Sequence, residues 1–254
     1  MAEITGQTRR DAMAIYVMWI REMKRLVRAK SRFLSSLVMP LMFLAFLGSG
    51  FRGVRFFGTS YIDFLTPGIA GMAVIFSSTF AGLSVLWDRE FGFLKEIAVA
   101  PVRNVAVVLG RIAGSATTAV FQAMAIIVLA IPLGFSARAE GVFISLPYIL
   151  LMAVTFTGMG LFFAAIIKDF HGFGLVMNFV IFPLFFLSGA IFPVSNLPSF
   201  LIPLAYLNPL FYGVDGLRAV LTGKSTISPL IDLASLVLFS IITVAAGAKM
   251  FDRL

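Results

Sequence analysis

The sequence predicts an all-α membrane protein in which residues 1–254 form a single domain with six transmembrane helices. Hydrophobic residues make up 60% of the chain and charged residues only 13%, whereas a soluble domain carries about a quarter charged residues. The apolar residues also gather in long runs without charge, and about 20 such residues cross the hydrocarbon layer as a helix. With His171 counted as neutral, these runs are 33–51, 64–87, 112–137, 141–167, 170–214 and 233–248.

Residues 10–30 precede the first run, and their pattern predicts an amphipathic helix that lies along the inner membrane interface. Apolar residues recur there at helical spacing and basic residues collect on the other side, as is typical of such helices. The basic residues are Arg21, Lys24, Arg25, Arg28 and Arg32. The alternative is a solvated basic helix that only sets the topology. Residues 1–32 contain no apolar core followed by a small-residue cleavage site, so no signal peptide is expected.

The net charge of +8 indicates membrane orientation rather than nucleic-acid binding. Of the 20 Lys and Arg residues, 15 fall in segments that the predicted topology places on one side of the membrane: 1–32, 87–111, Lys168 and 249–254. Cytoplasmic segments of membrane proteins carry this excess. We therefore expect a multi-pass protein of the cytoplasmic membrane, surrounded by lipid, with both termini in the cytoplasm and no nucleic-acid partner.

The first four runs each supply one membrane span. The second and third spans are predicted at 63–86 and at about 104–132. The last run is short by itself, but residues 225–231 extend it past Asp232, which can sit near the interface.

The run 170–214 is too long for one span. Its first part, 172–192, predicts the fifth span, whereas residues 195–224 are interrupted by Pro203, Pro209, Gly213 and Gly216. Proline removes a backbone donor, and broken backbone is tolerated at membrane depth only under cover of protein or water. We therefore expect 195–224 to form short re-entrant helices on the outer side. Two full spans in this run would give seven crossings and an outer C-terminus.

An island of charge at 87–103 separates the second and third spans. Its charges alternate in sign, apolar residues lie among them, and Pro101 ends the segment. Apolar residues rimmed by charges usually mark a protein contact. The island predicts a cytoplasmic protein partner, with a solvated loop as the alternative.

Two stretches carry a resemblance to a known family. The first is DREFGFLKEIAVAP at 88–101, and the second is FLSGAIFPVSNLP at 186–198, followed by YLNPLFYGVDGLRAVL at 206–221. The first resembles the coupling segment, and the second the signature after the fifth span, of ABC-2 type ABC transporter permeases. Their order and spacing match over nearly the whole chain. The drug and antibiotic exporter branch is the most similar.

This resemblance implies a permease homodimer with two copies of a separate ABC ATPase subunit. The island would be the coupling helix that passes the ATPase motion to the membrane helices. No G-x-x-x-x-G-K-[ST] phosphate loop occurs in the chain, so the partner would use ATP and Mg²⁺, and this chain would bind no cofactor. The implied coupling residues are Asp88, Arg89, Glu90, Phe91, Gly92, Phe93, Leu94, Lys95 and Glu96, with Phe91 and Phe93 as anchors.

The substrate path is predicted from polar residues in the spans. Ionisable residues are absent from mid-membrane positions of the first five spans, which argues against proton coupling and favours an amphiphilic or hydrophobic substrate. The candidate wall residues are Ser77, Ser78, Thr79, Gln122, Thr157 and Asn178, with Ser84, Thr117, Thr118 and Thr155 in addition. Each could instead bond to a neighbouring helix or to its own backbone. Gly110, Gly114 and Thr118 form a small-residue stripe that favours helix packing.

Asp215 and Arg218 lie three residues apart, and a salt bridge that braces the re-entrant part is favoured over a substrate gate. No metal site or catalytic residue is expected, because the chain has no cysteine and a single histidine. The other function classes are an ATPase-independent channel or scaffold and an intramembrane hydrolase. The hydrolase is disfavoured because His171 has no evident nucleophile beside it.

Overall fold

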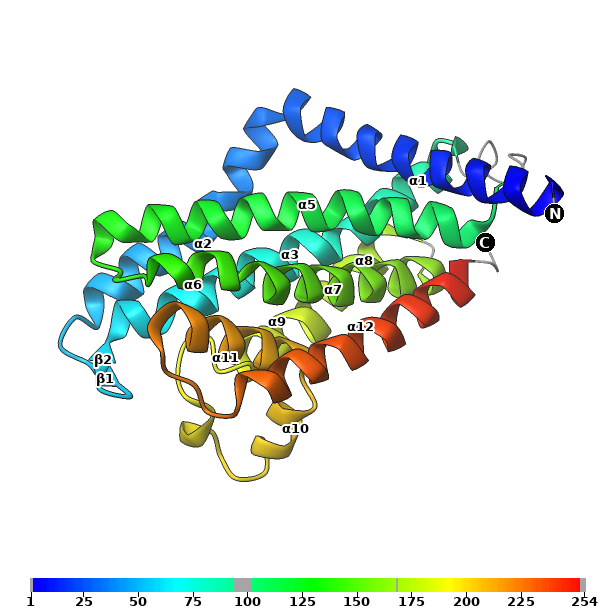
Figure 1. Ribbon diagram of the computed structural model, residues 1–254. Coiled ribbons are helices and arrows are strands. Elements are labelled where there is room, and N and C mark those ends of the chain that lie inside the picture. Colours follow the sequence, from blue (N-terminus) through cyan, green and yellow to red (C-terminus); the bar gives the residue numbers. More distant parts are fainter. Residues whose placement is uncertain (1, 94–101, 168, 252–254) are drawn as a thin grey trace.

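The computed structural model describes residues 2–93, 102–167 and 169–251, and it is almost entirely helical. Six segments within these residues are long and apolar enough to cross a membrane, which confirms the predicted number. They are Phe33–Gly50, Tyr61–Glu90, Asn104–Leu133, Ala139–Ile166, Phe170–Leu187 and Pro229–Met250. The two ends of the chain lie at the same end of this bundle, called the terminal end below, and a short hairpin lies at the other (Figure 1).

The first elements run from the terminal end to the hairpin and back. They are α1 (Ala2–Arg28), α2 (Lys30–Gly50), β1 (Arg55–Phe56), β2 (Thr59–Ser60) and α3 (Tyr61–Glu90). β1 and β2 pair antiparallel around Phe57 and Gly58, whose φ angles of 53° and 76° are typical of a type I′ turn. Ser60 caps α3 by accepting a hydrogen bond from the backbone N–H of Asp63.

The middle of the chain forms the third and fourth spans. The elements are α5 (Asn104–Ala130), η1 (Ile131–Leu133), α6 (Ala139–Ile144) and α7 (Leu146–Ile166). α7 is apolar along its length, and it packs against α3, α5 and α12. An apolar helix of this kind is typical of the centre of a bundle.

The last third contains a broken fifth span and the short helices that were predicted after it. The elements are α8 (Phe170–Val176), the π-helical η2 (Met177–Ile181), α9 (Phe182–Leu187), η3 (Val194–Asn196), α10 (Ile202–Tyr206), α11 (Pro209–Thr222) and α12 (Pro229–Phe251). Two short helices, α10 and α11, thus occupy the region 195–224. Their re-entrance into the outer leaflet stays a prediction.

Glycines decide how closely the central helices approach one another. A Cβ on Gly82 of α3 would lie 2.1 Å from the carbonyl oxygen of Gly160 on α7. A Cβ on Gly158 would meet the backbone of Thr243 on α12 at 2.8 Å. Such close backbone contact is how membrane helices gain packing energy without a hydrophobic driving force.

We expect Gly82→Ala to lower the free energy of unfolding by at least about 1–3 kcal/mol, because backbone atoms of α7 must shift to admit the methyl group. Gly174→Ala on α8 is the matched control, since a Cβ there would have no described atom within 4 Å. Thermal unfolding in detergent measures both variants. Equal midpoints for the two would contradict the close crossing of α3 and α7.

α1 packs along the N-terminal half of α5 over the predicted small-residue stripe. A Cβ on Gly110 would lie 2.6 Å from the Cβ of Met18, and one on Gly114 would lie 2.6 Å from the Cβ of Glu22. The indole N–H of Trp19 donates to the hydroxyl of Thr117 at 3.1 Å. The helix predicted at 10–30 is therefore longer and is held by α5, while its place at the membrane interface stays a prediction.

Candidate functional site

A buried carboxylate joins three helices at the terminal end. Asp88, in the last turn of α3, accepts a hydrogen bond from Arg21 of α1 at 2.6 Å and one from Arg111 of α5 at 2.5 Å. Arg111 also donates a hydrogen bond to the hydroxyl of Ser84 at 3.1 Å, and Ser84 lies one helical turn before Asp88 in α3. We call Arg21, Asp88 and Arg111 the charge cluster.

Two members of the charge cluster are shielded from solvent. Arg111 is 3% exposed and Asp88 is 7% exposed, whereas the Arg21 side chain is 33% exposed. A buried charge is tolerated only when it is paired and hydrogen-bonded, since desolvation otherwise costs several kcal/mol. Because Asp88 compensates two arginines from two different helices, the charge cluster fixes α1 and α5 to the end of α3.

The two phenylalanines of the island have different environments. Phe91 is 74% exposed, and its ring stacks on Trp87 with 5.7 Å between centroids. Trp87 in turn contacts Phe170 of α8 at 5.0 Å. Phe93 instead lies under the guanidinium of Arg21, 4.2 Å from its ring centroid. Phe91 therefore projects outward from an aromatic base, whereas Phe93 contacts α1.

The remaining island residues divide between α3 and a segment outside the described residues. Arg89 donates a hydrogen bond to the backbone carbonyl of Ile167 at the end of α7. Glu90, the last residue of α3, is exposed. Gly92 follows with a φ of 76°, a conformation that favours glycine and turns the chain away from the helix axis. Leu94, Lys95, Glu96 and Pro101 lie outside the described residues.

At the other end of the bundle, Arg218 ties α11 to its neighbours. It pairs with Asp215 at 3.5 Å, donates to the carbonyl of Gly189 at 2.8 Å, and lies over the ring of Phe64 at 4.0 Å. Burial lowers the pKa of Arg218 to about 10, and the carboxylate of Asp215 offsets part of this effect. The guanidinium stays protonated at neutral pH, so the pair remains charged.

Asp215 also organises the start of the last span. Its carboxylate accepts hydrogen bonds from the backbone N–H and the hydroxyl of Thr226 and from the backbone N–H of Ile227, at 2.8 to 3.0 Å. Asn208 caps α11 and donates to the carbonyl of Leu184 at 2.6 Å. Asp215 and Arg218 are thus built into the junction between α11, α3 and α12.

Only some of the candidate wall residues come together in one place. Four of them line a common cavity: Ser77, Ser84, Thr118 and Gln122. Ser78 and Thr79 are buried but do not line it. Thr157 donates to the hydroxyl of Ser115 at 2.8 Å and so joins α7 to α5. Asn178 lies apart from them, on the exposed side of the π-helical η2.

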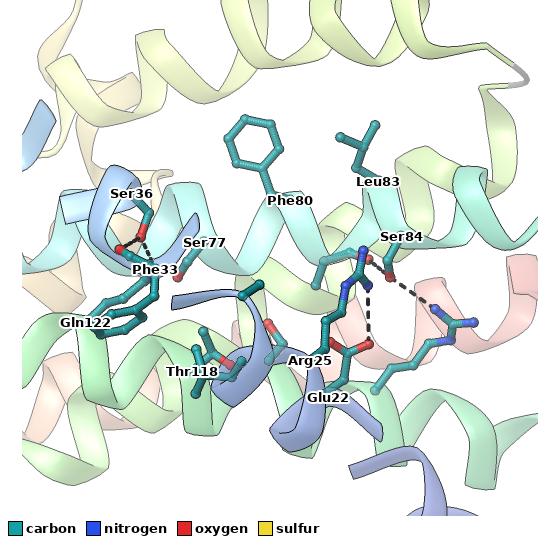
Figure 2. A pocket seen from close by; sticks show the side chains of 15 residues that line it. Glu22, Arg25, Phe33, Ser36, Ser77, Phe80, Leu83, Ser84, Thr118 and Gln122 are labelled. Carbon is teal, nitrogen blue, oxygen red and sulfur yellow. Dashed lines mark hydrogen bonds and ion pairs between the residues drawn. The ribbon is translucent and has the colours of Figure 1, made fainter. Parts of the chain in front are cut away.

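The cavity has a volume of about 370 Å³ and lies between α1, α2, α3 and α5. Its wall mixes apolar side chains with a row of polar ones, and it reaches the charge cluster at Arg111, which is one of its lining residues. Figure 2 shows Ser36, Ser77 and Gln122 at one end and Glu22, Arg25 and Ser84 at the other. The amide of Gln122 donates to the hydroxyl of Ser36 at 2.6 Å.

Other titratable groups give no sign of a catalytic or metal site. His171 is exposed in the first turn of α8, and the described part of the chain holds no group of three or more His, Cys, Asp or Glu residues. Asp232 is fully buried in protein in the first turn of α12, and neither of its carboxylate oxygens has a hydrogen-bond partner among the described residues.

Sequence reasoning missed Arg21 and Arg111 as members of the site. A signal was present, because Arg111 is an ionisable residue inside the predicted third span, and such residues usually face protein and have a partner. The identity of that partner depended on which face of α3 meets α5. The pattern along one segment does not contain that information.

The chain is similar in sequence to known proteins over most of its length. Residues 13–222 match the family model of the ABC-2 type transporter. The chain is 30% identical to the inner membrane transport permease YadH of Escherichia coli K12, over 89% of this chain and 90% of that protein. It is 28% identical to nodulation protein J of Rhizobium meliloti, over 89% and 87% of the two chains. Nodulation protein J of Bradyrhizobium diazoefficiens is 27% identical, with the same coverage.

Proposed function

Because this chain belongs to the ABC-2 type transporter family, we propose that it is the membrane-spanning subunit of an ATP-driven exporter. Its cargo would be an amphiphilic or hydrophobic molecule such as a drug, a lipid or a glycan, moved outward across the cytoplasmic membrane. Permeases of this family pair with an ABC ATPase, and we propose two ATPase copies on a permease homodimer. ATP and Mg²⁺ would bind to the ATPase, and both termini of this chain would lie in the cytoplasm.

The observation that carries this proposal is the exposed ring of Phe91, which stacks on another aromatic ring. Phe91 lies against Trp87, and Trp87 contacts Phe170 of α8, so residues of two helices support the exposed ring. Large aromatic side chains are also the residues that dominate protein interfaces when they fill a pocket on the partner. Phe91 would therefore seat in a groove of the ATPase, with Glu90 at its rim.

The charge cluster would carry the motion onward. Asp88 lies one turn before Phe91 on α3 and holds Arg21 of α1 and Arg111 of α5 at hydrogen-bond distance. A push on the end of α3 would thus act on three helices together. Moving a two-state equilibrium from about 1:99 to 99:1 takes roughly 5.5 kcal/mol of differential binding, which requires such stiff coupling.

We expect Phe91→Ala to weaken ATPase binding by roughly 30-fold, equivalent to about 2 kcal/mol for the loss of a central aromatic anchor. Combining it with Glu90→Arg should abolish co-purification of the ATPase and its stimulation by the permease. Phe143→Ala is the matched control, because Phe143 is 76% exposed in α6, and α6 lies near the hairpin end of the bundle (Figure 1). Pull-down and ATPase turnover measure the result. Unchanged recovery and turnover would favour an ATPase-independent channel or scaffold.

A further inference from the structure

Polar side chains line the cavity between α1, α2, α3 and α5, and several of them also bond to a neighbouring helix or to their own backbone. Four residues of α5 face it at intervals of four, three and four positions, so they form one straight row along the helix: Arg111, Ser115, Thr118 and Gln122. Ser77 and Ser84 of α3 line the same cavity, two turns apart from each other. Polar side chains of two spans therefore converge on an open volume.

Gln122 has hydrogen-bonding capacity that the described protein leaves unused. The side chain is only 5% exposed, and its Oε1 atom has no partner among the described residues, while Nε2 donates to Ser36. An unpartnered amide atom in such a site is costly. Exchanging the nitrogen and oxygen positions would leave the other amide atom unpaired instead. A hydroxyl satisfies either orientation, because it both donates and accepts.

The opposite end of the cavity carries an excess of positive charge. Arg25, Arg111 and Glu22 line it, and Arg111 pairs with Asp88, which also pairs with Arg21. Three arginines against two carboxylates leave a net charge of +1. Arg25 is also weakly held, since its nearest carboxylate oxygen, on Glu22, lies 3.7 Å away. An acidic group on a ligand would compensate the excess charge.

Apolar side chains supply much of the wall between the two ends. Gln122 lies eleven positions after Arg111 on α5, which is roughly 16 Å along a helix axis. Leu26, Phe33, Phe80 and Leu83 supply apolar surface to the wall. The volume of about 370 Å³ falls at the small end of the range for pockets that hold drug-sized ligands.

We propose that this cavity binds one acidic, hydroxylated amphiphile per chain, with the chemistry of a long-chain hydroxy fatty acid. The acid group pairs with Arg25 near the charge cluster, the mid-chain hydroxyl bonds to Gln122, and the hydrocarbon packs against Phe33 and Leu26. The site lies within one copy of the chain, so it requires neither the ATPase nor a second permease.

The test is competition between two probes, measured by native mass spectrometry on the purified chain in detergent. The probes are a long-chain fatty acid with a mid-chain hydroxyl and the same fatty acid without it, at equal concentration. We expect one bound molecule and about a tenfold preference for the hydroxylated probe. In Gln122→Leu the preference should fall to near unity while binding of both probes persists.

Two further variants locate the site. Thr118→Phe should fill the cavity and abolish binding of both probes, whereas Thr118→Val keeps the shape and should bind like the parent protein. Thr155→Val is the control for loss of a buried hydroxyl elsewhere, because Thr155 contacts Ser240 between α7 and α12. Size-exclusion profiles verify that each variant is folded.

Three results would overturn the proposed binding site. They are retention of neither probe by the parent protein, equal retention of both probes by the parent protein, and a preference in Gln122→Leu that equals that of the parent protein. A cavity filled only by water gives the first of these results. The measurement involves no ATPase, so its failure would leave the proposed transport function to be decided by the Phe91 and Glu90 variants. Success here with failure there would indicate an amphiphile-binding protein that works without the ATPase.

Discussion

Replacing Asp88 by Asn is expected to lower the free energy of unfolding by about 3–5 kcal/mol, the usual cost of removing one partner from a buried ion pair. The neutral amide leaves Arg111 buried at 3% exposure without its counter-charge, and it releases Arg21 of α1 from α3. The thermal unfolding midpoint in detergent measures the loss. Stimulated ATPase turnover should fall as well, because α1 and α5 no longer follow the end of α3.

The control for Asp88→Asn is Asp11→Asn. Asp11 pairs with Arg103 at 3.6 Å, and the Arg103 side chain is 71% exposed, so the loss should be at most about 1 kcal/mol. The double variant Asp88→Asn/Arg111→Met should recover part of the stability, since it removes the stranded charge. Equal unfolding midpoints for Asp88→Asn and Asp11→Asn would refute the structural role of the charge cluster.

The second large effect is expected for Arg218→Met at the hairpin end of the bundle. The change removes the pair with Asp215, the hydrogen bond to Gly189 and the contact with the ring of Phe64. Because Asp215 is 1% exposed, its carboxylate would lose a buried counter-charge, and we expect a loss of about 3–5 kcal/mol. Thermal unfolding in detergent again provides the measurement.

Arg138→Met provides the comparison, because Arg138 is exposed at the start of α6 and its guanidinium only lies against Gly223 at the end of α11, so its loss should stay within about 1 kcal/mol. The milder Arg218→Lys separates a brace from a substrate gate. A brace predicts lower thermal stability with an unchanged substrate dependence of transport. A gate predicts the reverse, with altered substrate dependence at parental stability.

Local properties of the chain allowed much of the fold to be predicted. The six spans follow from apolar length, and the short helices α10 and α11 follow from proline and glycine positions. The charged island was correctly read as a break between spans, although its first residues continue α3 to Glu90. The sequence also suggested the pair of Asp215 and Arg218, because side chains three positions apart on a helix lie on the same face and can touch.

Other parts of the site depend on contacts between distant segments. Asp88 was grouped with its exposed neighbours, yet this buried carboxylate lies in the last turn of α3, three residues before the outward ring of Phe91. Ser77 and Gln122 were grouped with Thr157 as wall residues, but only the first two face the cavity. Gly110 and Gly114 were correctly read as a packing stripe, although the sequence did not indicate that α1 would cover it.

The sequence by itself determined that this chain is a membrane protein with six spans and a charged segment between the second and third. Only the tertiary structure decided which residues meet: Asp88 with Arg21 and Arg111, Gly82 with Gly160, and the polar row of α5 with the cavity. The physical reason lies in the nature of the spans. An apolar helix such as α7 has no polar face to orient it, so backbone contacts at its glycines and hydrogen bonds of its threonines set its rotation.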